Sequence, residues 1–146
     1  MYHRWAALAL VLALCAVPTK QAAGQDTSSP PRGRKQTGAL GQNYPNPFNP
    51  LTHIPFSVVG CEGAVTRRVV SLRVYNVLAQ LVAVPHFEGE AAPDQPILNL
   101  SLPCGEYSAL WDGKVLNSGR EAASGVYLIE LVVDGNRYPR KAFVAK

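Results

Sequence analysis

The sequence has little charge, no long apolar run and few stretches free of glycine or proline, and each shortage excludes a class of protein. Charged residues make up 16% of the 146 residues and hydrophobic residues 47%, which excludes an intrinsically disordered chain. The longest apolar run covers residues 6–17, or 12 residues, whereas a transmembrane helix needs about 20. Glycine and proline contribute 12 residues each, so turns are expected to be frequent and long helices absent.

The net charge of +4 is confined to the N-terminal part of the chain. Five basic residues and one acidic residue precede Ala39, whereas nine basic and nine acidic residues occur from Ala39 onward. A surface that follows a phosphate backbone needs its positive charge on the folded domain. We therefore expect no nucleic-acid partner.

Residues 1–24 have the layout of a secretory signal peptide. A short basic start containing Arg4 precedes the apolar run, and residues 22–24 supply a cleavage site of small side chains. An uncleaved N-terminal anchor is one alternative. A lipoprotein attached through Cys15 is another, disfavoured because Leu14 stands where a small residue is required. In each case the chain is expected to be exported.

Residues 25–41 are expected to form a disordered, flexible linker. The segment is polar, contains Ser-Ser-Pro-Pro and a basic Arg-Gly-Arg-Lys cluster, and shows no apolar period. It therefore buries too little apolar surface to offset the entropy lost on ordering. The predicted organisation is a signal peptide over residues 1–24, a linker over 25–41 and one folded domain over 42–146.

From Gln42 onward the sequence predicts short strands separated by turns. Apolar and polar residues alternate, with turn signals about 8–12 residues apart, which is typical of an all-β, immunoglobulin-like β-sandwich of about seven strands. Pro55 cannot donate a backbone hydrogen bond to a neighbouring strand, so it is predicted to lie in an edge strand or at the start of a strand. Asp134 and Gly135 predict a tight hairpin. The strands are expected over residues 53–59, 69–76, 78–84, 96–102, 106–111, 125–133 and 137–145.

The Trp111-Asp-Gly segment at the end of one predicted strand is expected to have a structural role. Trp111 is large enough to fill the core between two sheets. Asp112 is expected to bond to the backbone of its own turn, and Gly113 to adopt a positive φ.

Cys61 and Cys104 are expected to form a disulfide, because the chain is exported and both lie in loops at strand ends. Two unpaired thiols are the alternative. A metal site with His53 and His86 is not expected, because their spacing matches no common zinc pattern. Neither histidine lies near a nucleophile motif, so no catalytic residue and no cofactor are expected and the protein is not predicted to be an enzyme.

The proline-rich segment over residues 44–50 is expected to be a stiff strap. Each proline fixes its own φ and holds the preceding residue extended. Tyr44 and Phe48 are expected to clip the strap onto the sandwich, where it would cover an exposed sheet edge. Its residues are Tyr44, Pro45, Asn46, Pro47, Phe48, Asn49 and Pro50.

Five motifs follow one another in order between Gln42 and the final lysine. They are the nonapeptide ending at Pro50, the VSLRVYN segment ending at Asn76 and followed by Leu78-Ala-Gln, Gly105 with the Trp111-Asp-Gly motif, the ASGVY segment ending at Tyr127, and Lys141 with Lys146. Together they resemble the type IX secretion system C-terminal sorting domain, type A, a family also described as FlgD-like immunoglobulin-like domains. The family usually has glycine where this chain has Ala79, so that turn is expected to differ.

The resemblance implies export and surface display. Members are carried across the inner membrane by a signal peptide into the periplasm and are then recognised by the type IX secretion machinery in the outer membrane. The domain is often cleaved off, and the cargo is joined to lipopolysaccharide at the cell surface. Carried over residue by residue, the resemblance makes Gly125, Tyr127, Lys141 and Lys146 recognition candidates, and the expected surface partner is lipopolysaccharide or another glycan.

The short predicted linker leaves an alternative open. Either a cargo is missing from this chain or the sandwich is itself the product. In the second case it would be a stand-alone secreted binding or structural module for a glycan or protein ligand. That alternative predicts an exposed aromatic patch on one sheet or at one loop end.

Overall fold

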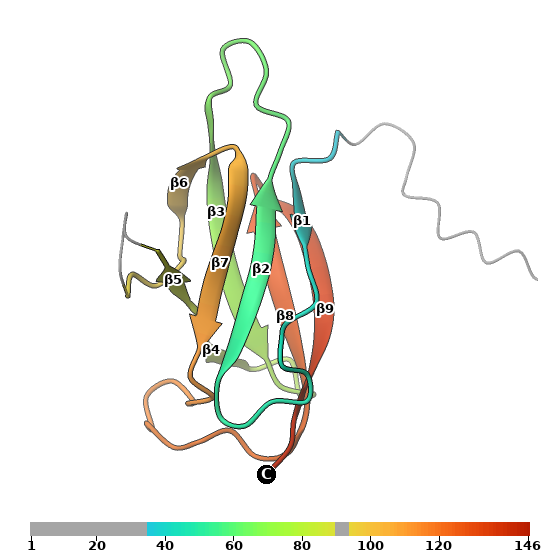
Figure 1. Ribbon diagram of the computed structural model, residues 1–146, viewed down its shortest axis with the longest axis vertical. Helices are drawn as coiled ribbons and strands as arrows, with labels where there is room; N and C mark the ends of the chain where they lie inside the picture. Colours follow the sequence, from blue (N-terminus) through green and yellow to red (C-terminus); the bar gives the residue numbers. More distant parts are fainter. Residues whose placement is uncertain (1–34, 90–93) are drawn as a thin grey trace, which may run out of the picture. The chain divides into compact units, whose positions relative to one another are not determined.

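Two antiparallel sheets face each other in the computed structural model, which describes residues 35–89 and 94–146. The folded unit spans Gly33–Lys146, and no helix occurs in the described ranges. The predicted all-β sandwich is therefore confirmed (Figure 1). The strands are β1 (Gly38–Leu40), β2 (Thr52–Val58), β3 (Arg67–Tyr75), β4 (Leu81–Ala83), β5 (His86–Glu88), β6 (Leu100–Pro103), β7 (Gly105–Trp111), β8 (Gly125–Val133) and β9 (Asn136–Val144).

One sheet has the order β1-β2-β7-β5 and the other the order β4-β3-β8-β9, with β6 paired to the first part of β3. The strands run along the long axis of the domain, with the chain's C-terminus at one end and the β2–β3 loop at the other (Figure 1). We call these the C-terminal end and the loop end.

The core lies between the two sheets and follows from the alternation of side chains along each strand. In β3, Val70, Leu72 and Val74 are all 0% exposed, and in β8, Ile129 and Leu131 are 1% and 0% exposed. The burial in β3 agrees with the alternation of apolar and polar residues expected for the strands. The outward row of β8 is also largely apolar, with Glu130 as its one acidic member.

The folded domain begins earlier than the predicted boundary at residue 42. Residues 38–40 form β1 and pair with β2, so this part of the predicted linker is wrong; residues 25–34 lie outside the described residues. Leu40 is 4% exposed and reaches the core. A Cβ on Gly38 would lie 2.7 Å from a methyl carbon of Val133, so glycine permits the close packing that makes this strand possible. Three residues are too few to show a strand period.

The prediction that Pro55 marks a sheet edge is wrong, because β2 lies between β1 and β7. Pro55 pairs with Ser108 of β7, and on the other side its carbonyl accepts the Gly41 N–H at 2.9 Å. The proline nitrogen faces the side of β2 where β1 has already ended at Leu40. A missing donor is therefore tolerated inside the sheet.

Two other predicted strands are shortened, and a second strand besides β1 was missed. The segment 78–84 is a strand only over Leu81–Ala83, because Asn76 organises a turn over residues 76–80: its side-chain oxygen accepts the Leu78 and Gln80 N–H groups, each at 3.0 Å. The segment 96–102 becomes β6 at Leu100–Pro103. This second missed strand is β5, which, like β1, has only three residues.

The Cys61–Cys104 disulfide is present and joins the β2–β3 loop to the turn between β6 and β7. The predicted hairpin is also confirmed: Asp134 and Gly135 have φ of 47° and 80° and connect Val133 to Asn136. The predicted signal peptide lies outside the described residues. Within residues 35–89 and 94–146, no helix has the length and apolar character needed to cross a bilayer.

Candidate functional site

The strap lies along the free edge of β9. The Phe48 N–H donates to the Phe143 carbonyl at 3.0 Å, and the Ala145 N–H donates to the Phe48 carbonyl at 3.1 Å. The Asn46 side-chain oxygen accepts the Phe143 N–H at 2.9 Å. The strap thus satisfies backbone groups that an edge strand leaves open, as predicted.

Only one of the two strap aromatics is a core residue. Phe48 is 2% exposed, and its ring centroid lies 5.0 Å from that of Trp111. Tyr44 is 55% exposed and stacks at 5.2 Å on His53 at the surface. Both rings therefore hold the strap to the sandwich as expected, but Phe48 does so in the core and Tyr44 at the surface, on His53 of β2.

The Trp111-Asp-Gly motif forms the seat of the strap. Trp111 is 2% exposed and its indole N–H donates to the Lys114 carbonyl at 3.0 Å. The Asp112 side chain accepts the Lys114 N–H at 3.0 Å, and Gly113 has φ of 73°. A Cβ on Gly113 would lie 2.2 Å from the Pro50 carbonyl oxygen. All three predicted structural roles are confirmed, and the glycine additionally lets the strap approach.

Segments far apart in the sequence meet at the C-terminal end through these contacts. Tyr127 of β8 packs edge-on against Trp111 at 5.5 Å, and the strap's Phe48 contacts the same indole at 5.0 Å. The Lys146 N–H donates to the Ser124 hydroxyl at 3.1 Å, and its ammonium pairs with Glu121 at 3.0 Å. These contacts thus pack four segments together: the strap, the Trp111-Asp-Gly turn, the start of β8 and the C-terminus.

The four recognition candidates occupy neighbouring strands at this end but differ in access. Gly125 pairs with Val144, has φ of 154° and has nothing within 4 Å of where a Cβ would stand. Lys141 and Lys146 are exposed. Tyr127 is 9% exposed and its hydroxyl donates to the Ala123 carbonyl at 2.9 Å, so its side chain is engaged inside the sandwich.

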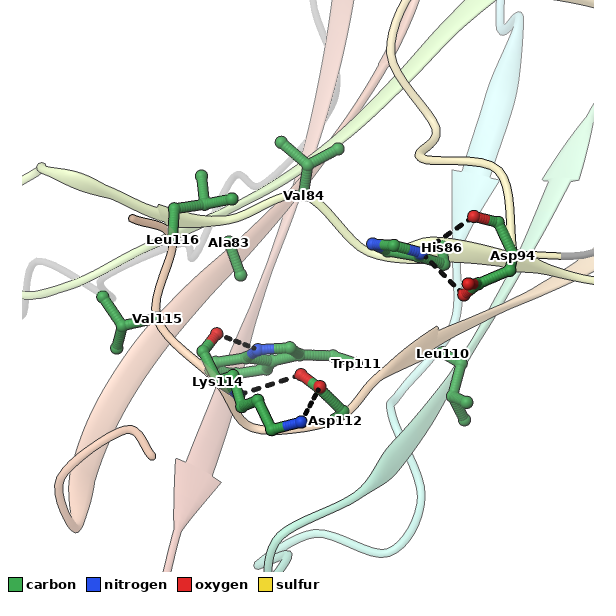
Figure 2. A pocket seen from close by; sticks show the side chains of 10 residues that line it. All are labelled: Ala83, Val84, His86, Asp94, Leu110, Trp111, Asp112, Lys114, Val115 and Leu116. Atoms are coloured by element: carbon green, nitrogen blue, oxygen red, sulfur yellow. Dashed lines mark hydrogen bonds and ion pairs between the residues drawn. The ribbon is translucent and has the colours of Figure 1, made fainter. Parts of the chain in front are cut away.

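A pocket of about 220 Å³ opens beside Trp111 (Figure 2). Two polar pairs face it: His86 Nδ1 lies 2.8 Å from Asp94 Oδ1, and Lys114 Nζ lies 3.2 Å from Asp112 Oδ2. The indole closes the inner wall but is almost fully covered, so it offers no stacking platform for a sugar. The residues that line the pocket are Ala83, Val84, His86, Asp94, Leu110, Trp111, Asp112, Lys114, Val115 and Leu116.

The charges around this pocket are already compensated. Burial raises the pKa of Asp112, but the backbone and side-chain hydrogen bonds from Lys114, with the charges of Lys114 and His86, outweigh it and lower the pKa below its ordinary value. Asp112 is therefore a stable carboxylate at neutral pH and a poor proton donor. We assign this pocket no chemistry.

A second polar group lies on the outer face of the β1-β2-β7-β5 sheet. His53 Nδ1 lies 2.9 Å from Glu88 Oε2, and the Ser108 hydroxyl donates to the same oxygen at 2.7 Å. The hydrogen bond from His53, reinforced by Ser108, lowers the pKa of Glu88. The serine donates to the acid and not to the imidazole, which differs from the relay of a hydrolase triad. In the described part of the chain no cluster of metal-ligating side chains occurs, and His53 and His86 pair with different carboxylates.

The outer face of β8 and its neighbours carries exposed apolar side chains at the C-terminal end. In β8, Val126 is 40% exposed and Leu128 is 37% exposed. Val126 pairs with Phe143 of β9, which is 42% exposed. At the tip of the β3–β4 turn, Val77 and Leu78 are 79% and 74% exposed. These residues define what we call the outer apolar face.

A hollow of about 520 Å³ lies in the outer apolar face, and we call it the outer hollow. Glu130 contributes to its lining and is 7% exposed. Its Oε2 receives one long contact from Arg137 Nη1 at 3.4 Å, whereas its Oε1 is buried without a hydrogen-bond partner among the described residues. The lining residues are Tyr75, Asn76, Val77, Ala79, Leu128, Glu130 and Arg137.

Sequence reasoning did not single out the outer hollow, although a signal was present. Strand alternation puts Glu130 in one row with Val126, Leu128 and Val132, and an acid in a row of aliphatic side chains is unusual. Glu130 pairs with Arg137, which follows seven residues later across the hairpin.

The scan against protein-family models, the search of curated proteins and the search of solved structures each found no match. Functional assignment therefore rests on the residues and their geometry.

Proposed function

We propose that the folded unit is a non-catalytic sorting domain of the type IX kind, read by the outer-membrane secretion machinery for translocation and cell-surface attachment. The observation that carries the proposal is the convergence of the resembling motifs. The strap, the Trp111-Asp-Gly turn, the start of β8 and the last residues of the chain pack into one end of the sandwich. Motifs that serve recognition by shape gain from being rigid and adjacent.

The accessible candidates suggest how that end is read. No heavy atom lies within 4 Å of where a Cβ on Gly125 would stand, so the surface beside this glycine is open. Lys141 and Lys146 are exposed cations. Tyr127 supports this surface from inside through Trp111. In this proposal the lysines contact the machinery and the tyrosine fixes the strand that presents them.

The proposal is tested by fusing Gly33–Lys146 behind a reporter that carries its own signal peptide, in a host with type IX secretion. The intact fusion is expected at the cell surface. Charge reversal of both Lys141 and Lys146 is expected to retain it in the periplasm. Charge reversal at Lys35, an exposed lysine that pairs with Glu62 of the β2–β3 loop at the other end, is not. Periplasmic retention of the intact, folded fusion would contradict the proposal.

A second candidate is a stand-alone secreted binding module, and the outer hollow is the observation that favours it. A monomeric protein rarely leaves contiguous apolar side chains exposed without a binding role. The partner is then a protein rather than a glycan, because Tyr75 is the single aromatic side chain among the described residues that line the hollow.

A further inference from the structure

The outer hollow combines a concave apolar lining with polar groups that are not internally satisfied. Leu128 and Val77 line it, and β8 continues the apolar surface through Val126 to Phe143 on β9. A concave apolar surface accommodates a protruding side chain better than a flat one does.

Cations surround the hollow in excess of acids. By strand register, Arg73 of β3 lies beside Glu130, and Lys141 of β9 lies beside Leu128. Arg137 lines the hollow, and its side chain is 70% exposed. Neither Arg73 nor Lys141 forms an ion pair with any residue that the structure describes. Three cations against one buried carboxylate favour a partner that carries negative charge.

The unpaired oxygen of Glu130 adds a second requirement. A buried carboxylate oxygen without a hydrogen bond destabilises the folded protein, and a partner that donates a hydrogen bond to it removes that penalty. The phosphate oxygens of an anionic lipid headgroup are acceptors, so they would not satisfy the Glu130 oxygen. A peptide supplies both groups, since its acidic side chains are anionic and its backbone N–H groups are donors.

We propose that the outer hollow binds an extended acidic-apolar peptide segment. An apolar side chain of the segment enters the hollow against Leu128 and Val77. A neighbouring carboxylate faces Arg137, Arg73 and Lys141. The Glu130 carboxylate turns so that Oε1 faces the segment and accepts one of its N–H groups. The inference goes beyond the sorting function, because it concerns a peptide-binding site that needs no secretion machinery to act.

The test is selection of short random peptides against the intact protein, followed by binding measurements on the enriched peptides by fluorescence polarisation. The enriched peptides are expected to carry Asp or Glu beside a large apolar residue. Replacing their acids with Lys is expected to weaken binding by about tenfold or more, because the ion pairs become repulsive.

Two variants of the protein with matched controls locate the site. Leu128→Ser and Arg137→Glu are each expected to weaken binding by about tenfold or more. Leu51→Ser is the control for the first because Leu51 is 38% exposed, close to the 37% of Leu128. Arg120→Glu is the control for the second because Arg120 is an exposed arginine away from the hollow. Both controls are expected to bind normally.

Glu130→Leu separates a binding role from a structural one. Removing the unpaired carboxylate is expected to leave the urea midpoint unchanged or higher, yet to weaken peptide binding by about tenfold. A lower midpoint with unchanged binding would overturn the proposal. Three further outcomes would also overturn it: enrichment of basic peptides, dimerisation that Leu128→Ser abolishes, or binding to phosphatidylglycerol vesicles in place of peptides. Failure here would leave the export experiment unaffected, and failed export would leave peptide binding intact.

Discussion

Removing the Phe48 side chain is expected to release the strap from the sandwich. The ring is 2% exposed and contacts Trp111. Its transfer to water costs about 2–3 kcal/mol, and the cavity left behind raises the loss for Phe48→Ala to about 3–5 kcal/mol. Two of the strap's three hydrogen bonds to Phe143 and Ala145 are formed by Phe48 backbone groups, so their alignment is expected to weaken as well.

The matched control is Tyr44→Ala in the same strap. Tyr44 is 55% exposed and stacked on His53, so the expected loss is less than about 1 kcal/mol. Urea unfolding of both variants measures the difference in the free energy of unfolding, and hydrogen exchange at the Phe143 and Ala145 amides reports release of the strap. Equal losses for the two variants, or a loss below about 1 kcal/mol for Phe48→Ala, would refute the assignment of Phe48 as the anchor.

Three further predictions concern a turn, the disulfide and an acid. Ala79 has φ of 57°, so Ala79→Gly is expected to raise the free energy of unfolding by about 0.5–1 kcal/mol; a lower urea midpoint would contradict this. Reducing the Cys61–Cys104 disulfide, which closes a sequence separation of 43, is expected to lower the free energy of unfolding by about 4 kcal/mol through loop entropy. An unchanged urea midpoint in dithiothreitol would exclude this stabilising role. The hydrogen bond from His53 lowers the pKa of Glu88 below its ordinary value of 4.5. The contribution of the Glu88 carboxylate to the free energy of unfolding is therefore present above pH 4.5 and is lost as the pH falls through the lowered pKa. Glu88→Gln is therefore expected to be less stable than the parent at pH 6 and equal to it at low pH, with a difference below about 1 kcal/mol because the pair is partly exposed.

The β8–β9 hairpin and the core rows show how far local pattern reaches. Alternation in β3 and β8 separated the two faces of each strand, and Asp134-Gly135 identified the hairpin, because both signals depend on residues close in sequence. Trp111, Asp112 and Gly113 were also correctly assigned, since a bulky aromatic and a turn dipeptide have few alternative uses.

β1 and Pro55 show where local pattern fails. Residues 38–40 are a strand only because β2 offers them a partner and Gly38 fits against Val133. Pro55 is allowed inside a sheet only because its neighbour β1 ends one residue before the missing donor is needed. Neither condition is visible in the sequence around the residue itself.

The sequence by itself determined the all-β class, the inward rows of the strands, the tight turns and the order of the motifs, because each follows from alternation or from the backbone preferences of glycine, proline and asparagine. Only the tertiary structure decided which aromatic anchors the strap, that Tyr127 lies inside while Lys141 lies outside, and that Glu130 shares a hollow with Arg137. Those outcomes depend on contacts between strands distant in sequence, and it is the pairing of whole strands that sets them.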